Sequence, residues 1–198
     1  MVRASTAVLA AAAALALYGC ARKDETPTIN ASMTGVMEPK AEKIWGIASH
    51  AYNDIGDALL PEKISDADWK EIGEAGRAIK ERAAILATAP HVVVATANEP
   101  IMGSQAVGQK GNLGKAWEAV SAQAVQARIE ADRPGFQAKA RVLVEAADGL
   151  VRASQTKDAA LFYKIASGMD EVCDGCHEPF WGTDVPPPLP LAGGQRVQ

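Results

Sequence analysis

Residues 173–177 read Cys-Asp-Gly-Cys-His and carry the clearest chemistry in this chain. The thiols of Cys173 and Cys176, three positions apart on one turn, can add to the two vinyl groups along one edge of a porphyrin. The adjacent imidazole of His177 then lies under the ring, where it can bind the iron as proximal ligand. The spacing therefore predicts one covalently attached haem c.

Two other kinds of site also use a cysteine pair at this spacing. A zinc site needs two further Cys or His ligands, and only His50 and His91 remain, at irregular spacing. A thioredoxin-like redox pair normally opens a helix after a strand, and no such pattern precedes Cys173. Haem attachment is the interpretation that these residues favour.

The third cysteine, Cys20, stands at the end of an N-terminal export signal. Arg3 precedes an apolar run from Ala7 to Leu17, and a small residue stands just before Cys20. The run is shorter than the ~20 residues that a transmembrane helix needs. Residues 17–20, Leu-Tyr-Gly-Cys, resemble the bacterial lipobox, whose cysteine is acylated. The alternative is an ordinary cleaved signal with a cysteine near its end.

This leader predicts where the protein resides. We expect residues 1–19 to be a lipoprotein signal peptide and Cys20 to become the lipidated N-terminus. The polar residues 20–32 then form a tether, and the domain is periplasmic, anchored to a bacterial membrane through its lipid.

Composition favours packed helices over a sheet. The chain has 198 residues, of which 39 are alanine and only 10 are aromatic. The balance of 24 acidic against 20 basic residues argues against nucleic acid as a partner. The fold class we expect is all-α.

Apolar residues recur at helical spacing in five segments. We expect helices over residues 33–55, 69–86, 113–127, 136–154 and 161–180. Ser65 or Asp66 can cap the second helix and Thr156 the last. Residues 90–112 hold no helical period and predict a loop, with a short extended piece at Val92–Val94. Residues 182–198 are rich in proline and glycine and predict an extended tail.

The position of the haem motif constrains the other iron ligand. Only 21 residues follow His177, and none is Met or His. Any sixth ligand must therefore come from upstream, or the sixth position is open.

An all-α exported domain with this motif in its last helix resembles the cytochrome c' superfamily, class II of the c-type cytochromes. The resemblance covers roughly residues 33–89 and 134–181. It rests on the residues that match a group of proteobacterial haem proteins: Met33, Pro39, Ala41, Trp45, Trp69, Phe180 and Trp181, besides the motif itself. It implies a four-helix bundle over residues 33–181 with the haem between the helices, and it leaves residues 90–131 as an insertion carrying an extra helix.

The resemblance implies two possible kinds of haem site. In one kind the haem is five-coordinate and binds small gases such as NO and CO. In low-spin relatives a methionine of the first helix is the sixth ligand; Met33 matches that position, and Met37, one turn later, is the alternative. Both methionines could instead simply pack the core.

Methionine ligation raises the reduction potential and suits electron transfer. We therefore expect a monohaem c-type cytochrome that carries single electrons between redox partner proteins, and not an enzyme. The five-coordinate gas-binding protein is the alternative. Relatives often pair through their helices, so a homodimer is also an expectation.

Overall fold

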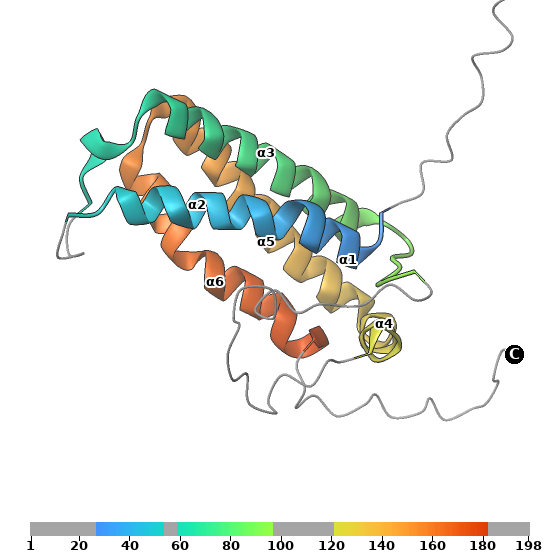
Figure 1. Ribbon diagram of the computed structural model, residues 1–198. Coiled ribbons are helices and arrows are strands. Elements are labelled where there is room, and N and C mark those ends of the chain that lie inside the picture. Colours follow the sequence, from blue (N-terminus) through green and yellow to red (C-terminus); the bar gives the residue numbers. More distant parts are fainter. Residues whose placement is uncertain (1–26, 54–58, 97–120, 182–198) are drawn as a thin grey trace, which may run out of the picture.

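The computed structural model describes residues 27–53, 59–96 and 121–181 (Figure 1). Across these ranges the regular structure is helical, with one isolated bridge between Tyr52 and Leu59 and no strand. The described chain is all-α, as the composition predicts. The signal peptide, Cys20, most of the expected tether and the tail over 182–198 lie outside the described residues.

The helical elements follow one another along the chain with mostly short connections. Their order is α1 (Ile29–Ser32), the π-helical turn η1 (Met33–Met37), α2 (Glu38–His50), the 3-10 turn η2 (Pro61–Lys63), α3 (Asp66–Thr88), α4 (Ala122–Ala131), α5 (Arg133–Thr156) and α6 (Ala159–Trp181).

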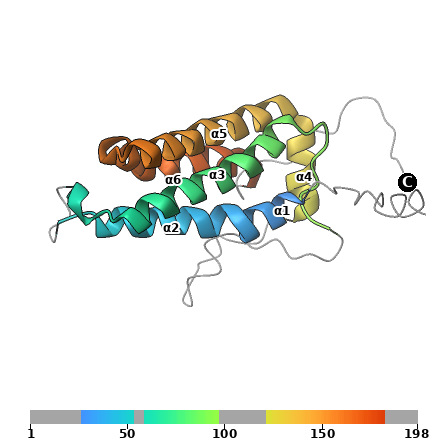
Figure 2. The same cartoon turned by 90° about the horizontal axis from the view of Figure 1, so that it is seen from above.

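Within the described ranges, the longest helices pack in sequence around a common interior. α3 lies along α5, α5 along α6, and α2 contacts both α3 and α6. The short helix α4 lies across one end, against α5 and α6 (Figures 1 and 2). In both views α1, α4 and the C-terminal end of α6 lie at the same end of the molecule. The haem motif and Met33 therefore come to one end of the fold.

Two groups of buried apolar residues fill the interior. The first core cluster includes Ile44, Trp69, Ile72, Ile79, Leu150, Phe162 and Met169. The second core cluster, at the α4 end, includes Ile29, Met37, Leu86, Val94, Val125, Ile129, Phe136 and Phe180. Leu143 packs against both, so the two clusters meet along α5.

The first helix begins earlier and ends earlier than the pattern predicts. It was expected over 33–55 but runs from Ile29 to His50. The backbone N–H of Ile29 donates to the Val93 carbonyl at 2.8 Å, so residues 29–32, expected in the tether, form its first turn instead. Its sequence alone does not reveal this start, because the stabilising partner lies more than sixty positions away.

A π-helical turn interrupts this first helix just before Pro39. The N–H of Glu38 donates to the carbonyl of Met33, five residues back. Pro39 has no N–H, and in a regular α-helix its ring would clash with the carbonyl of Gly35. The wider turn lies where the proline would break the α-helical ladder, and it contains both Met33 and Met37.

The ends of the later helices confirm one predicted cap and correct another. Ser65 caps α3: its hydroxyl accepts from the Asp68 N–H at 3.2 Å, and the Asp68 carboxylate accepts from the Ser65 N–H at 2.9 Å. Thr156 is not the cap of α6, because it is still part of α5. Lys157 then takes a left-handed conformation, with φ 51°, and Asp158 accepts from the Leu161 N–H at 2.9 Å.

The expected helix over 113–127 also differs from the structure. The helix observed there is α4, which begins at Ala122 and reaches Ala131. Ser121 caps it by accepting from the Ala124 N–H at 3.1 Å. Residues 113–120 lie outside the described ranges.

Close packing of α3 on α5 predicts that Gly76→Ala destabilises the fold. A Cβ at Gly76 would lie 2.9 Å from the carbonyl oxygen of Ala147, a backbone atom that cannot move alone. We expect a loss of about 1–3 kcal/mol in the free energy of unfolding, measured by chemical denaturation.

Gly46→Ala is the matched control for that substitution. Gly46 is also inside a helix, but a Cβ there meets nothing within 4 Å. It should gain about 0.5–1 kcal/mol from helix propensity. Equal effects at the two positions would contradict the close approach of α3 and α5.

Candidate functional site

The whole Cys-Asp-Gly-Cys-His motif lies within α6, which continues helical to Trp181. Cys173 and Cys176 are therefore one turn apart, and both are partly buried free thiols. Cys173 packs against the first core cluster and Cys176 against the second. The two thiols thus face the interior where the clusters meet.

Burial dominates the acid–base behaviour of the thiols. It raises the pKa of Cys173 to about 11, helped by the carboxylates of Asp170 and Asp174. It also raises the pKa of Cys176 to about 11, with Cys173 adding to the effect and Lys139 opposing it. A dithiol redox centre needs a depressed thiol pKa, so these surroundings disfavour a thioredoxin-like pair. Thioether linkage would leave no charge to bury here.

The imidazole of His177 is in a similar environment. Burial lowers its pKa, and the nearby Asp174 carboxylate opposes that shift in part. The ring is therefore neutral near pH 7, and a neutral imidazole has a nitrogen lone pair free for a metal. The indole of Trp181, one turn later, has its ring centroid 6.4 Å from that of His177.

Both methionines proposed as ligands lie near the motif's end of the fold. Met37 is buried in the second core cluster, and Met33 packs against the same cluster, as do Cys176 and Trp181. The structure thus brings the two predicted candidates and one motif thiol to a single cluster. Met37 is the more deeply buried of the two, and Met33 is half-buried.

Three other residues that could in principle bind iron are His50, His91 and Met169. His50 and His91 are both exposed, at the end of α2 and just after Pro90. Met169 is buried in the first core cluster, on α6 itself. Neither histidine is among the residues that pack around the motif.

Two aromatic residues, Phe180 and Trp181, follow the motif at this end of the fold. Phe180 is buried and packs edge-to-face on Phe136, with ring centroids 5.4 Å apart. Arg128 of α4 donates from Nη1 to the Phe180 carbonyl at 3.2 Å. α4 therefore holds the C-terminal end of α6.

Lys139 and Arg128 are contacts of the motif helix that the sequence did not reveal. The Lys139 ammonium lies 3.7 Å from the position of a Cβ built on Gly175, between the two cysteines. Both basic residues come from helices far from the motif in sequence, and no local pattern marks them.

A test of whether a haem fits comes from the polar groups that pack against the first core cluster. The indole N–H of Trp45 is buried and has no hydrogen-bond partner among the described residues. Trp45 packs against the first core cluster, as Cys173 does. Two thiols, a neutral imidazole and a buried indole donor suit a group with apolar faces and a carboxylate-bearing edge. These residues fit a haem.

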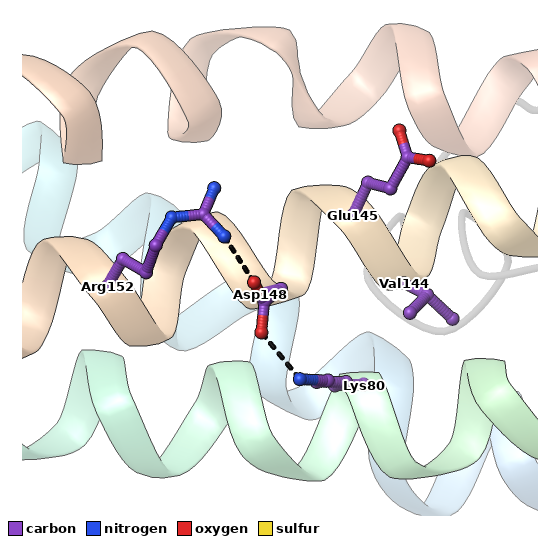
Figure 3. Close-up of a pocket in the computed structure, with 5 residues that line it drawn as sticks. All are labelled: Lys80, Val144, Glu145, Asp148 and Arg152. Atoms are coloured by element: carbon purple, nitrogen blue, oxygen red, sulfur yellow. Dashed lines mark hydrogen bonds and ion pairs between the residues drawn. The ribbon is translucent and has the colours of Figure 1, made fainter.

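A surface depression lies between α3 and α5 (Figure 3). Asp148 forms ion pairs there with Lys80 and Arg152, and Val144 and Glu145 complete the lining. The hydrogen bond from Lys80 lowers the pKa of Asp148, with further lowering by Arg152. This is an ion-paired surface, and it brings no thiol or imidazole together with these charges.

No helix among the described residues is long and apolar enough to cross a membrane. Nor do the described ranges contain three or more His, Cys, Asp or Glu side chains grouped to hold a metal ion. No family model matches the chain, and no curated protein or solved structure matches it either.

Proposed function

We propose that this protein is a monohaem c-type cytochrome that carries single electrons between redox partner proteins. Cys173 and Cys176 hold one haem c through thioethers, and His177 is the proximal iron ligand. The observation that carries the proposal is the position of this motif on α6, with its thiols packed where the two core clusters meet. The fold we propose is a four-helix bundle of the cytochrome c' type, formed by α2, α3, α5 and α6.

The haem and the chain would have separate roles. When bound, the haem supplies the one-electron chemistry. The chain holds and shields it: the thioethers fix its position, the imidazole of His177 ligates, and Phe180 and Trp181 keep water from this end of the core. Met33 is the proposed distal ligand and Met37 the alternative. A thioether ligand raises the reduction potential, which suits an electron carrier.

We also propose that the protein is periplasmic and anchored to a membrane through a lipid on Cys20. Support comes from the leader pattern of residues 1–20 and from the polar segment that follows. Covalent haem attachment is an extracytoplasmic process, so the leader and the motif agree with each other.

The matched pair Met33→Leu and Met37→Leu tests the proposed electron-transfer site. Leucine replaces methionine at similar volume but cannot ligate iron. We expect the wild-type reduced protein to be low-spin and to bind CO only slowly. Met33→Leu should convert most of the haem to a high-spin, CO-binding form, while Met37→Leu stays low-spin; absorption spectra with and without CO report both.

Met169→Leu is the control, because Met169 is buried but lies on the same helix as His177. It should leave the spectrum unchanged. Conversion by Met37→Leu instead of Met33→Leu would move the ligand to Met37. A wild-type protein that is high-spin and binds CO would favour the five-coordinate gas-binding alternative.

A further inference from the structure

A short segment of the expected insertion contacts the start of the helix that carries Met33. Residues 89–94, which we call the strap, follow α3 and pass the beginning of α1 (Figures 1 and 2). The Val93 carbonyl accepts from the Ile29 N–H at 2.8 Å, and the Val94 carbonyl accepts from the Asn30 N–H at 2.9 Å. The first turn of a helix has N–H groups with no partner inside the helix, and the strap supplies partners for two of them.

Gln126 of α4 forms hydrogen bonds with the backbone of the strap. Its Oε1 accepts from the Val94 N–H at 2.9 Å, and its Nε2 donates to the Val92 carbonyl at 3.0 Å. Val92 and Val94 are buried, with 6% and 1% of their surface exposed. One amide side chain therefore satisfies two backbone groups of a buried segment.

Two side chains of α5 hold the beginning of the strap. Gln137 donates to the Ala89 carbonyl at 3.2 Å, and Arg133 donates to the carbonyl of Pro90. The strap is thus bound to α5 at its start, to α4 in its middle and to α1 at its end.

The first turn of α1 in turn sets the position of Met33. Ile29 is fully buried in the second core cluster, and Met33 follows it by four residues, on the same face of the helix. Met33 packs against the same cluster as Cys176. A shift of the first turn would therefore move the Met33 sulfur relative to α6.

We propose that Gln126 is a positioning residue: through the strap it fixes the first turn of α1 and so holds Met33 as a ligand. The strap and α4 thereby control whether external ligands reach the iron. This inference rests on the proposed function, because it requires methionine ligation.

Gln126→Leu tests the proposal in the haem-loaded protein. Leucine leaves the Val94 N–H and the Val92 carbonyl without their partner in a buried place, which weakens the strap. We expect CO to bind the reduced protein about tenfold faster, equivalent to ~1.4 kcal/mol in the opening of the Met33–iron bond. Amide hydrogen exchange at Ile29 and Asn30 should also accelerate, independently of the haem.

Gln123→Leu is the matched control, since Gln123 lies on the same helix but is exposed. It should change neither the CO rate nor the exchange. In the double variant Met33→Leu/Gln126→Leu, the CO rate should equal that of Met33→Leu alone, because Gln126 acts through Met33. Gln126→Glu keeps the acceptor for the Val94 N–H but loses the donor to the Val92 carbonyl and to the Glu130 carboxylate. It gives a second measurement if the leucine variant folds poorly, and its CO rate should also exceed that of the wild-type protein.

The outcomes distinguish a failure of the Gln126 role from a failure of Met33 ligation. If the wild-type protein resists CO and both Gln126 variants match it in CO rate and exchange, the role of Gln126 is wrong while methionine ligation stands. If the wild-type protein binds CO as fast as Met33→Leu, Met33 ligation fails and this inference fails with it.

Discussion

Replacing both motif cysteines, Cys173→Ala/Cys176→Ala, is expected to abolish covalent haem attachment completely. When the wild-type chain is produced in bacteria able to attach haem c, it should keep its haem through denaturing electrophoresis. The double variant should run free of haem, because no other thiol packs at this place in the described structure. Haem staining of the gel and the mass of the intact chain report the result.

The two single variants and a variant of the third cysteine are the controls for that experiment. Cys173→Ala and Cys176→Ala should each retain one thioether, at lower yield, because each variant keeps one of the two motif thiols. Cys20→Ala should keep the haem entirely and lose only the lipid. Retention of haem by the double variant, or its loss on replacing Cys20, would contradict the division of roles among the three cysteines.

The second large effect is expected from Phe162→Ala. Phe162 is fully buried in the first core cluster and packs edge-to-face on Trp69, with ring centroids 6.0 Å apart. Removing the ring leaves a cavity between α6 and α3, at a cost of about 3–5 kcal/mol. That is a large share of the 5–15 kcal/mol that typically stabilises a domain. Thermal unfolding followed by circular dichroism should show a melting temperature lower by roughly 10 °C.

Val142→Ala serves as the control for this core substitution. Val142 is on α5 with 47% of its surface exposed, so its truncation should change stability by no more than about 0.5 kcal/mol. A Phe162→Ala protein as stable as the control would contradict the packing of α6 on α3 through this ring.

The helices that the sequence predicted well are those with local signals at their ends. α3 is predicted over 69–86 and spans Asp66–Thr88, because Ser65, one of the two expected caps, lies next to its apolar stripe. α5 and α6 likewise extend only a few residues beyond their stripes. Periodicity identifies the buried face of such helices, and caps and prolines limit their length.

The start of the first helix could not be predicted in the same way. Residues 29–32 fall in the segment expected to be a tether, and their helical turn depends on hydrogen bonds to Val93 and Val94. Those partners come from a segment without any periodic pattern. Val92–Val94, where the sequence predicts a short extended piece, lie in this strap without forming a strand, and only the structure shows what they contact.

The residues of the candidate site also fall into two groups: those recognisable from the sequence and those that only the packing reveals. Cys173, Cys176 and His177 are adjacent in sequence, so their chemistry is recognisable from spacing alone. Gln126 forms hydrogen bonds with Val94 and Val92 of the strap, 32 and 34 residues away in sequence. Arg128 donates to the Phe180 carbonyl, 52 residues away. Such contacts exist only after the helices pack. The local motif predicts the cofactor, and the packing indicates which residues hold its surroundings in place.

The most direct test of the account is to extract the purified protein with acidified acetone and measure the haem by its pyridine spectrum. This treatment removes haem that is not covalently bound. We predict that one haem per chain stays with the protein and gives the spectrum of a porphyrin linked by two thioethers. Pigment that passes into the acetone, or a purified protein without haem, would contradict the assignment of Cys173, Cys176 and His177.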